Sequence, residues 1–521
     1  MWFVCGDKRM RQKKFAQIRD YSKGMITTKT PVELPPGASP SMLNFELWNN
    51  ILRRTRGIQD FAANTFTGIP LKMEQFVLTG GGSYLVLVTV SKIYYWNTGT
   101  SQWTDITGTS GWTGTAVRNV STDIMSNKLF ICDGENDVME WTGTGDVTVC
   151  SELATLVITS YFVSPFWSHL LLANTIESGT ACPQRVRWSD TGDEEEWDSG
   201  NANFVDLVDT VDFITGMAAL MDKKYIYKER SIYELVYVGY PRIFIPAPLI
   251  DGVGCIAPGT LENMGTHHIF LGSDNIYTFD GRKEEIVGDD IRNLIFGTNS
   301  IVNPGAIQNS IGMYIEEIEE YWLGVPTGVS TVPNHFFRYH YPTESWRPRT
   351  YSNTIYCFGV WYEDSAKKWT DLVGKWTDQS WKWNDTTMLA AYPVTLFGCY
   401  YSSAGHIKKL DFTTPLDGDT LPETWWETGD IEGTQRWVEY WVECEGFGSL
   451  ELLYSTDEGV SWTSLGVKSV PSQYSWIKWS FNLTRDLIRF KLVHTETGDI
   501  NIRKQIPWYV PKVRPTEVVT S

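Results

Sequence analysis

The chain repeats one hydrophobic pattern: a short apolar run, a polar turn, and a second apolar run that ends in aromatic residues. Ser83–Asn97 reads SYLVLVTVSKIYYWN, and Lys128–Gly143 reads KLFICDGENDVMEWTG. Such pairs of runs predict β-hairpins. The layout returns in five further stretches, which are residues 169–190, 223–239, 267–288, 321–348 and 396–412.

The spacing of these hairpins indicates the architecture. Successive hairpins lie roughly 40 to 60 residues apart, as four-stranded propeller blades do. A ring of blades also covers most strand edges, which keeps a long β chain soluble. We therefore expect an all-β protein in which residues 66–415 form a β-propeller of six to eight irregular blades.

The pattern changes after residues 412–430, which read FTTPLDGDTLPETWWETGD and are typical of a linker. Beyond them, apolar and polar residues alternate with a period of two, which marks strands with one buried face. This predicts a C-terminal β-sandwich over residues 416–521, with an extended tail. Residues 1–65 then form an N-terminal segment of extended strands, which we expect to contact other subunits or an adaptor protein.

The charge balance limits the partners of the chain. Its 44 basic and 62 acidic residues give a net charge of −18. This charge opposes non-specific adhesion to nucleic acid and to anionic membranes. No apolar run is long enough to span a membrane, and the start, MWFVCGDKRMRQKKF, lacks the apolar stretch of a secretory signal. We expect synthesis and folding in a cytoplasm, with the eight scattered cysteines as buried thiols.

The stretch STDEGVSW, Ser455–Trp462, fits the Asp-box hairpin motif of sialidases and other propeller glycosidases. As a turn, it needs Asp457 to accept backbone N–H bonds, Gly459 to take a positive φ, and Trp462 to pack beneath. The single clear copy lies outside the expected propeller. There is no GxSxG, phosphate loop or HExxH motif, and no spacing assembles the arginine trio of a sialidase. We expect no enzyme, catalytic residue, cofactor or metal, and keep a propeller carbohydrate hydrolase as the alternative.

Two clusters are candidate interfaces. Arg53, Arg54 and Arg56 follow an Asn-Asn turn, and strand alternation predicts Arg54 and Arg56 on one face, where they would form salt bridges to another subunit or an adaptor. The stretch KKWTDLVGKWTDQSWKWND, residues 367–385, either plugs a propeller face or docks protein or carbohydrate. Its candidate interface residues are Trp369, Trp376, Trp381 and Trp383.

Residues 20–61 carry a resemblance. They combine a Pro- and Gly-rich crossing (LPPGASP), a strand (SMLNFEL), a turn and a basic return strand (LRRTRGI). This order resembles the opening of the tail nozzle, or tail hub, proteins of short-tailed bacteriophages, in which a β-propeller follows. The hairpin series and the repeated Lys-Trp-Thr-Asp of residues 368–378 extend the resemblance.

The resemblance implies a virion structural protein with no catalytic residues. It implies a homo-oligomeric ring, a hexamer of about six copies, assembled in the host cytoplasm. Such a ring forms the DNA conduit of the viral tail below the portal and adaptor proteins, part of the head-tail connector. It contacts tail fibres or spikes and retains packaged double-stranded DNA, without sequence-specific binding, until DNA ejection. A receptor-binding tail protein is the remaining alternative.

A conduit that lets DNA slide should carry more Asp and Glu than Lys and Arg, because each fixed cation would anchor a phosphate. We expect this channel between subunits, with the acidic stretches Asp193–Asp198 and Glu316–Glu320 as candidate linings. The axis of each propeller should instead be filled by side chains and hold no metal.

Overall fold

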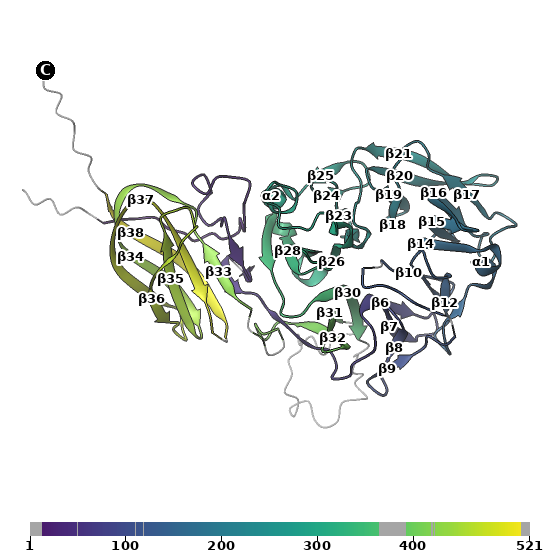
Figure 1. The fold of residues 1–521 in the computed structure, drawn as a ribbon, viewed down its shortest axis with the longest axis horizontal. Coiled ribbons are helices and arrows are strands. Elements are labelled where there is room, and N and C mark those ends of the chain that lie inside the picture. Colours follow the sequence, from purple (N-terminus) through teal and green to yellow (C-terminus); the bar gives the residue numbers. More distant parts are fainter. Residues whose placement is uncertain are drawn as a thin grey trace, which may run out of the picture.

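The computed structural model describes residues 13–48, 50–109, 111–117, 119–363, 392–417, 420, 422–496 and 498–511. The chain is built almost entirely of antiparallel β-sheet and has two parts, a propeller and a sandwich (Figure 1). Among the described residues, no helix combines the length and the apolar composition needed to cross a membrane.

Seven four-stranded antiparallel sheets form the blades of the propeller, which confirms the expected fold class and sets the blade number. Within a blade the strands pair in sequence order, because short polar turns join neighbouring strands as hairpins. The first four blades consist of β6 (Pro70–Val77), β7 (Ser83–Thr89), β8 (Ile93–Asn97) and β9 (Gln102–Asp105); β10 (Ser121–Met125), β11 (Lys128–Cys132), β12 (Met139–Trp141) and β13 (Thr148–Val149); β14 (Ile158–Phe166), β15 (His169–Glu177), β16 (Thr180–Trp188) and β17 (Asn203–Asp206); and β18 (Ile214–Leu220), β19 (Lys223–Lys228), β20 (Ser231–Gly239) and β21 (Ile243–Asp251).

The last three blades follow the same plan, but the seventh takes its outer strand from the start of the chain. They consist of β22 (Glu262–Asn263), β23 (His268–Leu271), β24 (Ile276–Phe279) and β25 (Glu284–Ile286); β26 (Ile311–Ile315), β27 (Glu320–Val325), β28 (His335–His340) and β29 (Ser345–Arg349); and β30 (Ile355–Glu363), β31 (Tyr392–Tyr401), β32 (Ala404–Asp411) and β5 (Gly57–Asp60). In the part of the chain that the structure describes, two short α-helices, α1 (Ser151–Leu156) and α2 (Arg292–Ile295), lie in connections.

Strand β5 closes the propeller ring. It pairs antiparallel with β32, and the ion pair between Lys408 Nζ and Asp60 Oδ1, at 2.8 Å, crosses this junction. The backbone passes very close to the next segment here, since a Cβ on Gly57 would lie 1.8 Å from the Leu416 carbonyl oxygen. The ring therefore depends on a contact between residues about 350 positions apart.

The sandwich draws strands from both ends of the chain. The order β2-β33-β37-β34-β38-β4-β3 forms the main path, β1 pairs with β38, and β35 pairs with both β36 and β37. These strands are β1 (Lys14–Phe15), β2 (Met42–Leu43), β3 (Phe45–Trp48), β4 (Ile51–Arg54), β33 (Thr424–Glu427), β34 (Ile431–Gly446), β35 (Ser449–Ser455), β36 (Thr463–Ser469), β37 (Ser475–His494) and β38 (Ile500–Pro511).

This arrangement differs from the expected division at residues 65 and 415. The segment expected to reach outward toward other subunits instead supplies four strands to the sandwich and one to the propeller. The sequence could not reveal this, because hydrophobic alternation identifies strands but not their distant partners. The N-terminal strands cover edges of the C-terminal ones, since β1 and β4 pair with β38 and β2 pairs with β33.

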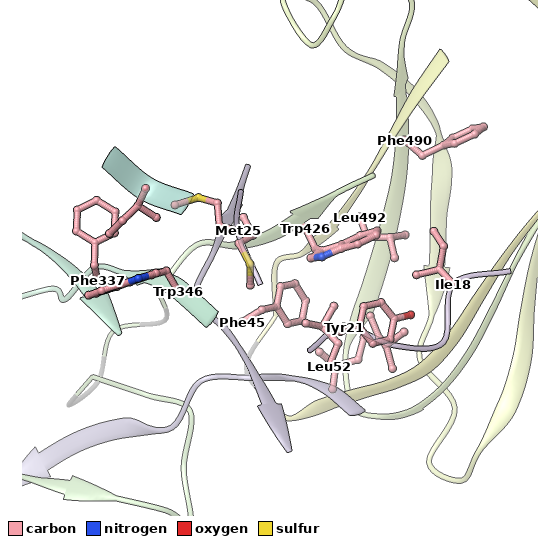
Figure 2. Packing of buried hydrophobic residues seen from close by; sticks show 14 of the residues in the cluster. Ile18, Tyr21, Met25, Phe45, Leu52, Phe337, Trp346, Trp426, Phe490 and Leu492 are labelled. Carbon is pink, nitrogen blue, oxygen red and sulfur yellow. The ribbon is translucent and has the colours of Figure 1, made fainter. Parts of the chain in front are cut away.

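Propeller and sandwich share one hydrophobic core, which runs through the N-terminal segment. Figure 2 shows Met25 and Phe45 between Trp346 of blade six and Trp426 of β33. Tyr21 packs edge-on against Trp426, with ring centroids 5.6 Å apart. The N-terminal segment thus acts as the packing layer between the two parts.

The closing contact gives a test of this fold. Substitution Gly57→Ala should destabilise the protein by about 1–3 kcal/mol, because the added methyl group overlaps the Leu416 carbonyl and displaces β5 from its position in blade seven. Urea unfolding measures the change. The matched substitution Gly80→Ala, where a Cβ meets nothing within 4 Å, should leave the free energy of unfolding nearly unchanged. Equal effects of the two substitutions would contradict a closure that depends on β5.

Candidate functional site

The basic strand expected at a subunit surface lies inside the chain. Arg54 is 1% exposed, and its guanidinium donates to the carbonyl oxygens of Pro422 and of Glu496, the latter at 2.9 Å. Burial lowers the pKa of Arg54 to about 10. Arg54 shares the buried face of β4 with Leu52, so it is not available to another subunit.

The two neighbouring arginines also bind within the chain. Arg56 Nη1 lies 2.5 Å from Asp499 Oδ2, and Arg53 Nε lies 2.5 Å from Glu46 Oε1. The three arginines thus hold β4 and the residues after it within the sandwich part of the same chain. The expected pairing of Arg54 and Arg56 on one outward face is not what the structure shows, because β4 ends at Arg54 and the chain turns toward β5.

A buried network of opposite charges joins the sandwich to blade six. Arg338 Nη1 lies 3.1 Å from Glu46 Oε2 and 3.7 Å from Glu320 Oε2. Arg347 Nη1 lies 3.4 Å from Glu320 Oε1. Burial raises the pKa of Glu46, but the charges of Arg338 and Arg53 outweigh it and hold that pKa below its usual range.

Glu320 corrects one sequence expectation. It belongs to the stretch Glu316–Glu320 that was a candidate channel lining, yet it is 5% exposed and accepts a hydrogen bond from Trp322 Nε1 at 2.8 Å. Its carboxylate neutralises Arg338 and Arg347 rather than facing a channel. Charge density in the sequence could not separate this residue from its exposed neighbour Glu316.

Asn44 is a junction residue that sequence reasoning missed. Its backbone has a φ of +54°, and its side chain is fully buried. The amide donates to the Glu423 carbonyl at 2.6 Å and accepts from the Thr350 backbone N–H at 3.0 Å. It therefore joins the N-terminal segment to the last strand of blade six and to the start of the sandwich. The only signal in the sequence was an Asn between two apolar residues, which suits a left-handed backbone.

The Asp-box forms the turn between β35 and β36. Asp457 Oδ1 accepts the Ser461 backbone N–H at 2.9 Å and the Ser455 hydroxyl at 2.7 Å. Hydrogen bonds from Ser461 and Ser455 lower the pKa of Asp457 to about 2. Gly459 has a φ of +92°, and Trp462 is half-buried, with Lys491 Nζ 5.3 Å from its ring centroid. All three residues occupy the structural positions that the motif predicts.

The remaining interface candidates lie outside the described residues. Trp369, Trp376, Trp381 and Trp383 fall within residues 364–391. The other acidic stretch, Asp193–Asp198, lies between β16 and β17. Its Trp197 is buried and donates from Nε1 to the Glu194 carbonyl at 3.0 Å, and Glu194 lies 3.5 Å from Lys128 Nζ of β11, so this stretch packs against blade two.

The axis of the propeller holds a cavity, contrary to the expectation that side chains fill it. The cavity has a volume of about 900 Å³. Its lining comes from the innermost strands or adjoining loops of all seven blades, so it lies along the ring axis. Representative lining residues, one from each blade, are Glu74, Asp123, Phe162, Met217, Glu262, Tyr314 and Phe358.

The number of blades in the ring explains why a cavity lies on its axis. With seven blades, the innermost strands stand around the axis instead of meeting on it, as the labels β6, β10, β14, β18, β26 and β30 show in Figure 1. Several lining residues are polar, as is typical of a cavity that can hold water.

Comparison with known proteins gives fold likenesses only. No family model and no curated protein sequence matches the chain. The solved structure "YCF48 bound to D1 peptide" is 10% identical with a TM-score of 0.38, covering 68% of this chain and 96% of its own. The Neurospora crassa Pan2 WD40 domain is 7% identical with a TM-score of 0.36, covering 66% and 89%. A family 29 carbohydrate binding module is 14% identical with a TM-score of 0.14, covering 24% and 82%.

The buried charge network gives a stability prediction. Substitution Glu46→Ala should lower the free energy of unfolding by about 3–5 kcal/mol, because it removes the carboxylate that lies 3.1 Å from Arg338 and 2.5 Å from Arg53 in a buried network. The double substitution Glu46→Leu with Arg338→Met should cost less than the sum of the two single changes. Urea unfolding of the four proteins measures this coupling, and the exposed Glu33→Ala is the control.

The same carboxylate should produce an acid-sensitive junction. The pKa of Glu46 is lower in the folded protein than its ordinary value of 4.5. Its stabilising effect is therefore present above pH 4.5 and lost as the pH falls through the folded-state pKa. In a pH series of unfolding experiments, Glu46→Gln should show a shallower loss of stability on the acid side than the parent. If the two proteins lose stability equally as the pH falls, Glu46 is not the group responsible for the acid sensitivity.

Substitution Asp457→Ala should lower the melting temperature of the sandwich, because the turn loses the acceptor for Ser461 and Ser455. Asp457→Asn keeps one acceptor oxygen and should lose less. Differential scanning calorimetry measures both. We expect each substitution to affect function only by unfolding the sandwich. If the parent cleaves sugars and a folded Asp457→Ala protein does not, the turn has a catalytic role.

Proposed function

We propose that the chain is a virion structural protein that assembles into the ring-shaped tail nozzle of a short-tailed bacteriophage. In this function it forms the DNA conduit below the portal and adaptor proteins. It retains packaged DNA until ejection, and it contacts the neighbouring tail fibres or spikes. It acts through its shape and charge and catalyses no reaction.

The observation that carries the proposal is the place of residues 20–61 in the fold. These residues bear the resemblance to nozzle proteins, and they include β2, β3, β4 and β5, which join the sandwich to the propeller. Because residues 20–61 supply strands to both the sandwich and the propeller, the resemblance concerns a part of the chain on which the fold depends. A resemblance confined to a loose terminal extension would say less about the whole protein.

The charge of the chain supports a conduit. A net charge of −18 repels the phosphate backbone, and several arginines and lysines are withdrawn from the surface by buried ion pairs. Arg338, Arg347 and Arg349 are each 1% exposed and face Glu46, Glu320 and Asp417. Because each of these buried cations is paired with a buried carboxylate, the acidic excess of the chain stays at the surface.

The Asp-box does not favour the hydrolase alternative. Asp457 and Gly459 are engaged in the β35–β36 turn of the sandwich, away from the propeller axis. In this position the motif supports the geometry of a hairpin. The observation that would favour a receptor-binding protein, an exposed tryptophan patch, concerns residues 364–391, outside the described part of the chain.

The native mass of the purified protein tests the proposal. Light scattering after size-exclusion chromatography, over a range of protein concentrations, should give a mass of about six chains. Electron microscopy of that particle should show a ring with a central passage. Side chains of Asp and Glu should outnumber those of Lys and Arg along the passage, and binding to double-stranded DNA should be weak even at low salt.

Three results would contradict the proposal. The first is a monomer at all concentrations, and the second is an assembly with no passage. The third is a passage lined mainly by Lys and Arg, which would hold DNA rather than let it slide. A monomer that hydrolyses a glycoside would return the hydrolase to first place.

A further inference from the structure

The axial cavity of the propeller has an unbalanced charge. Its charged lining residues are Lys72 and Glu74 on β6, Asp123 on β10 and Glu262 on β22. Three carboxylates and one ammonium group leave a net charge of −2 when all four are ionised. The cavity is therefore suited to a positively charged occupant.

The protein compensates these carboxylates only in part. Lys72 Nζ lies 4.0 Å from Glu74 Oε2, and the Thr122 hydroxyl donates to the same oxygen at 2.9 Å. Asp123 Oδ2 accepts the Ser164 hydroxyl at 2.7 Å, and Lys224 donates to Ser164 from behind. In contrast, Glu262 forms no ion pair within salt-bridge distance among the described residues.

Glu262 shows the effect of this imbalance. Burial raises its pKa to about 7; the charge of Lys72 lowers that pKa, and the charge of Glu74 raises it further. The pKa of Glu74 is also raised, mainly by burial. Glu74 of blade one and Glu262 of blade five thus share one lysine, Lys72. A second cation between the two carboxylates would stabilise the charged form of each.

Aromatic side chains complete the lining. Phe162, Tyr314, Phe358 and Tyr362 come from three different blades. Phe162 and Phe358 are 8% and 9% exposed because they pack in hydrophobic core clusters, so they give the cavity an apolar wall rather than open ring faces. An apolar wall beside carboxylates favours an ammonium compound with an aliphatic chain over a metal ion that keeps its water.

The positions of the carboxylates support the same choice. Within the described residues, the only group of three ligand atoms that lie within 4.8 Å of one another is Glu152, Glu196 and Asp198, which is not in the axial cavity. The three axial carboxylates do not form such a group. A molecule with two separated charges can reach more than one of them.

We propose that the axial cavity of the propeller is a binding site for a small organic cation with two ammonium groups, a diamine. One ammonium group is held near Glu262 and the other near Glu74 and Asp123, with the aliphatic chain against the aromatic rings. The site is a property of the single propeller. It goes beyond the proposed ring function and does not depend on assembly.

Isothermal titration calorimetry of the full chain at pH 8 tests this site, with putrescine (1,4-diaminobutane) as the titrant. We expect saturable binding of about one molecule per chain. The neutral analogue 1,4-butanediol and the anionic analogue succinate should show no binding. Magnesium chloride should neither bind nor compete. No saturable binding of putrescine, equal binding of the diol, or preferential binding of succinate or Mg²⁺ would each overturn the proposal.

Variants locate the site. Glu262→Gln and Asp123→Asn keep the side-chain shape and should each weaken putrescine binding about tenfold. Lys72→Met removes the competing cation and should strengthen it. Glu33→Gln removes an exposed carboxylate elsewhere and should leave the affinity unchanged.

Putrescine should bind more tightly to Lys72→Met and more weakly to Glu262→Gln, whereas Glu33→Gln should leave its affinity unchanged. This pattern distinguishes a cation site in the cavity from general electrostatic attraction to an acidic protein. An equal loss of affinity in Glu262→Gln and Glu33→Gln would show attraction without a site, and would overturn the proposal. Circular dichroism melts of each variant confirm that it is folded. The native mass, measured in parallel, tells whether the ring proposal fails independently.

Discussion

The backbone pairing and packing of residues 18–60 is the contact on which the rest of the structure depends. This segment donates from Met25 N–H to the Trp346 carbonyl at 2.9 Å, supplies β2, β3 and β4 to the sandwich, and then closes blade seven with β5. A propeller needs such a closure, because an open ring leaves two unpaired edges. Here the closing strand is also the link to the second domain.

The buried ion pairs of Glu46, Arg338 and Glu320 determine the orientation of the sandwich on the propeller more than they stabilise the contact between them. Desolvation of buried charges offsets much of their attraction, so an apolar replacement could be equally stable. Opposite charges, however, match only when Glu46 of β3 lies against Arg338 of β28. Together with Asn44, which hydrogen-bonds Thr350 and the Glu423 carbonyl, they fix how the sandwich sits on the propeller. A rigid joint of this kind suits a subunit that must keep its shape in an assembly.

The buried charges are largely paired, and the acidic excess of the chain lies at the surface. Arg349, for example, is buried against Asp417, so such pairs leave the net charge of −18 unchanged. The axial cavity continues this trend inside the propeller, where three carboxylates face one lysine. A surface that repels phosphate and a cavity that attracts cations have the same origin, which is the excess of 18 acidic over basic residues.

The sequence by itself determined the features that depend on near neighbours. Alternation and turn residues predicted the hairpins, such as Ser83–Asn97, and the Ser455–Trp462 turn, because their partners lie only a few residues away. The tertiary structure decided the number of blades, the burial of Arg54 and the partners of β4 and β5. Arg54 contacts Pro422 and Glu496, which lie 368 and 442 residues along the chain, and no local pattern contains such pairings. The axial cavity likewise arises only when seven blades close into a ring.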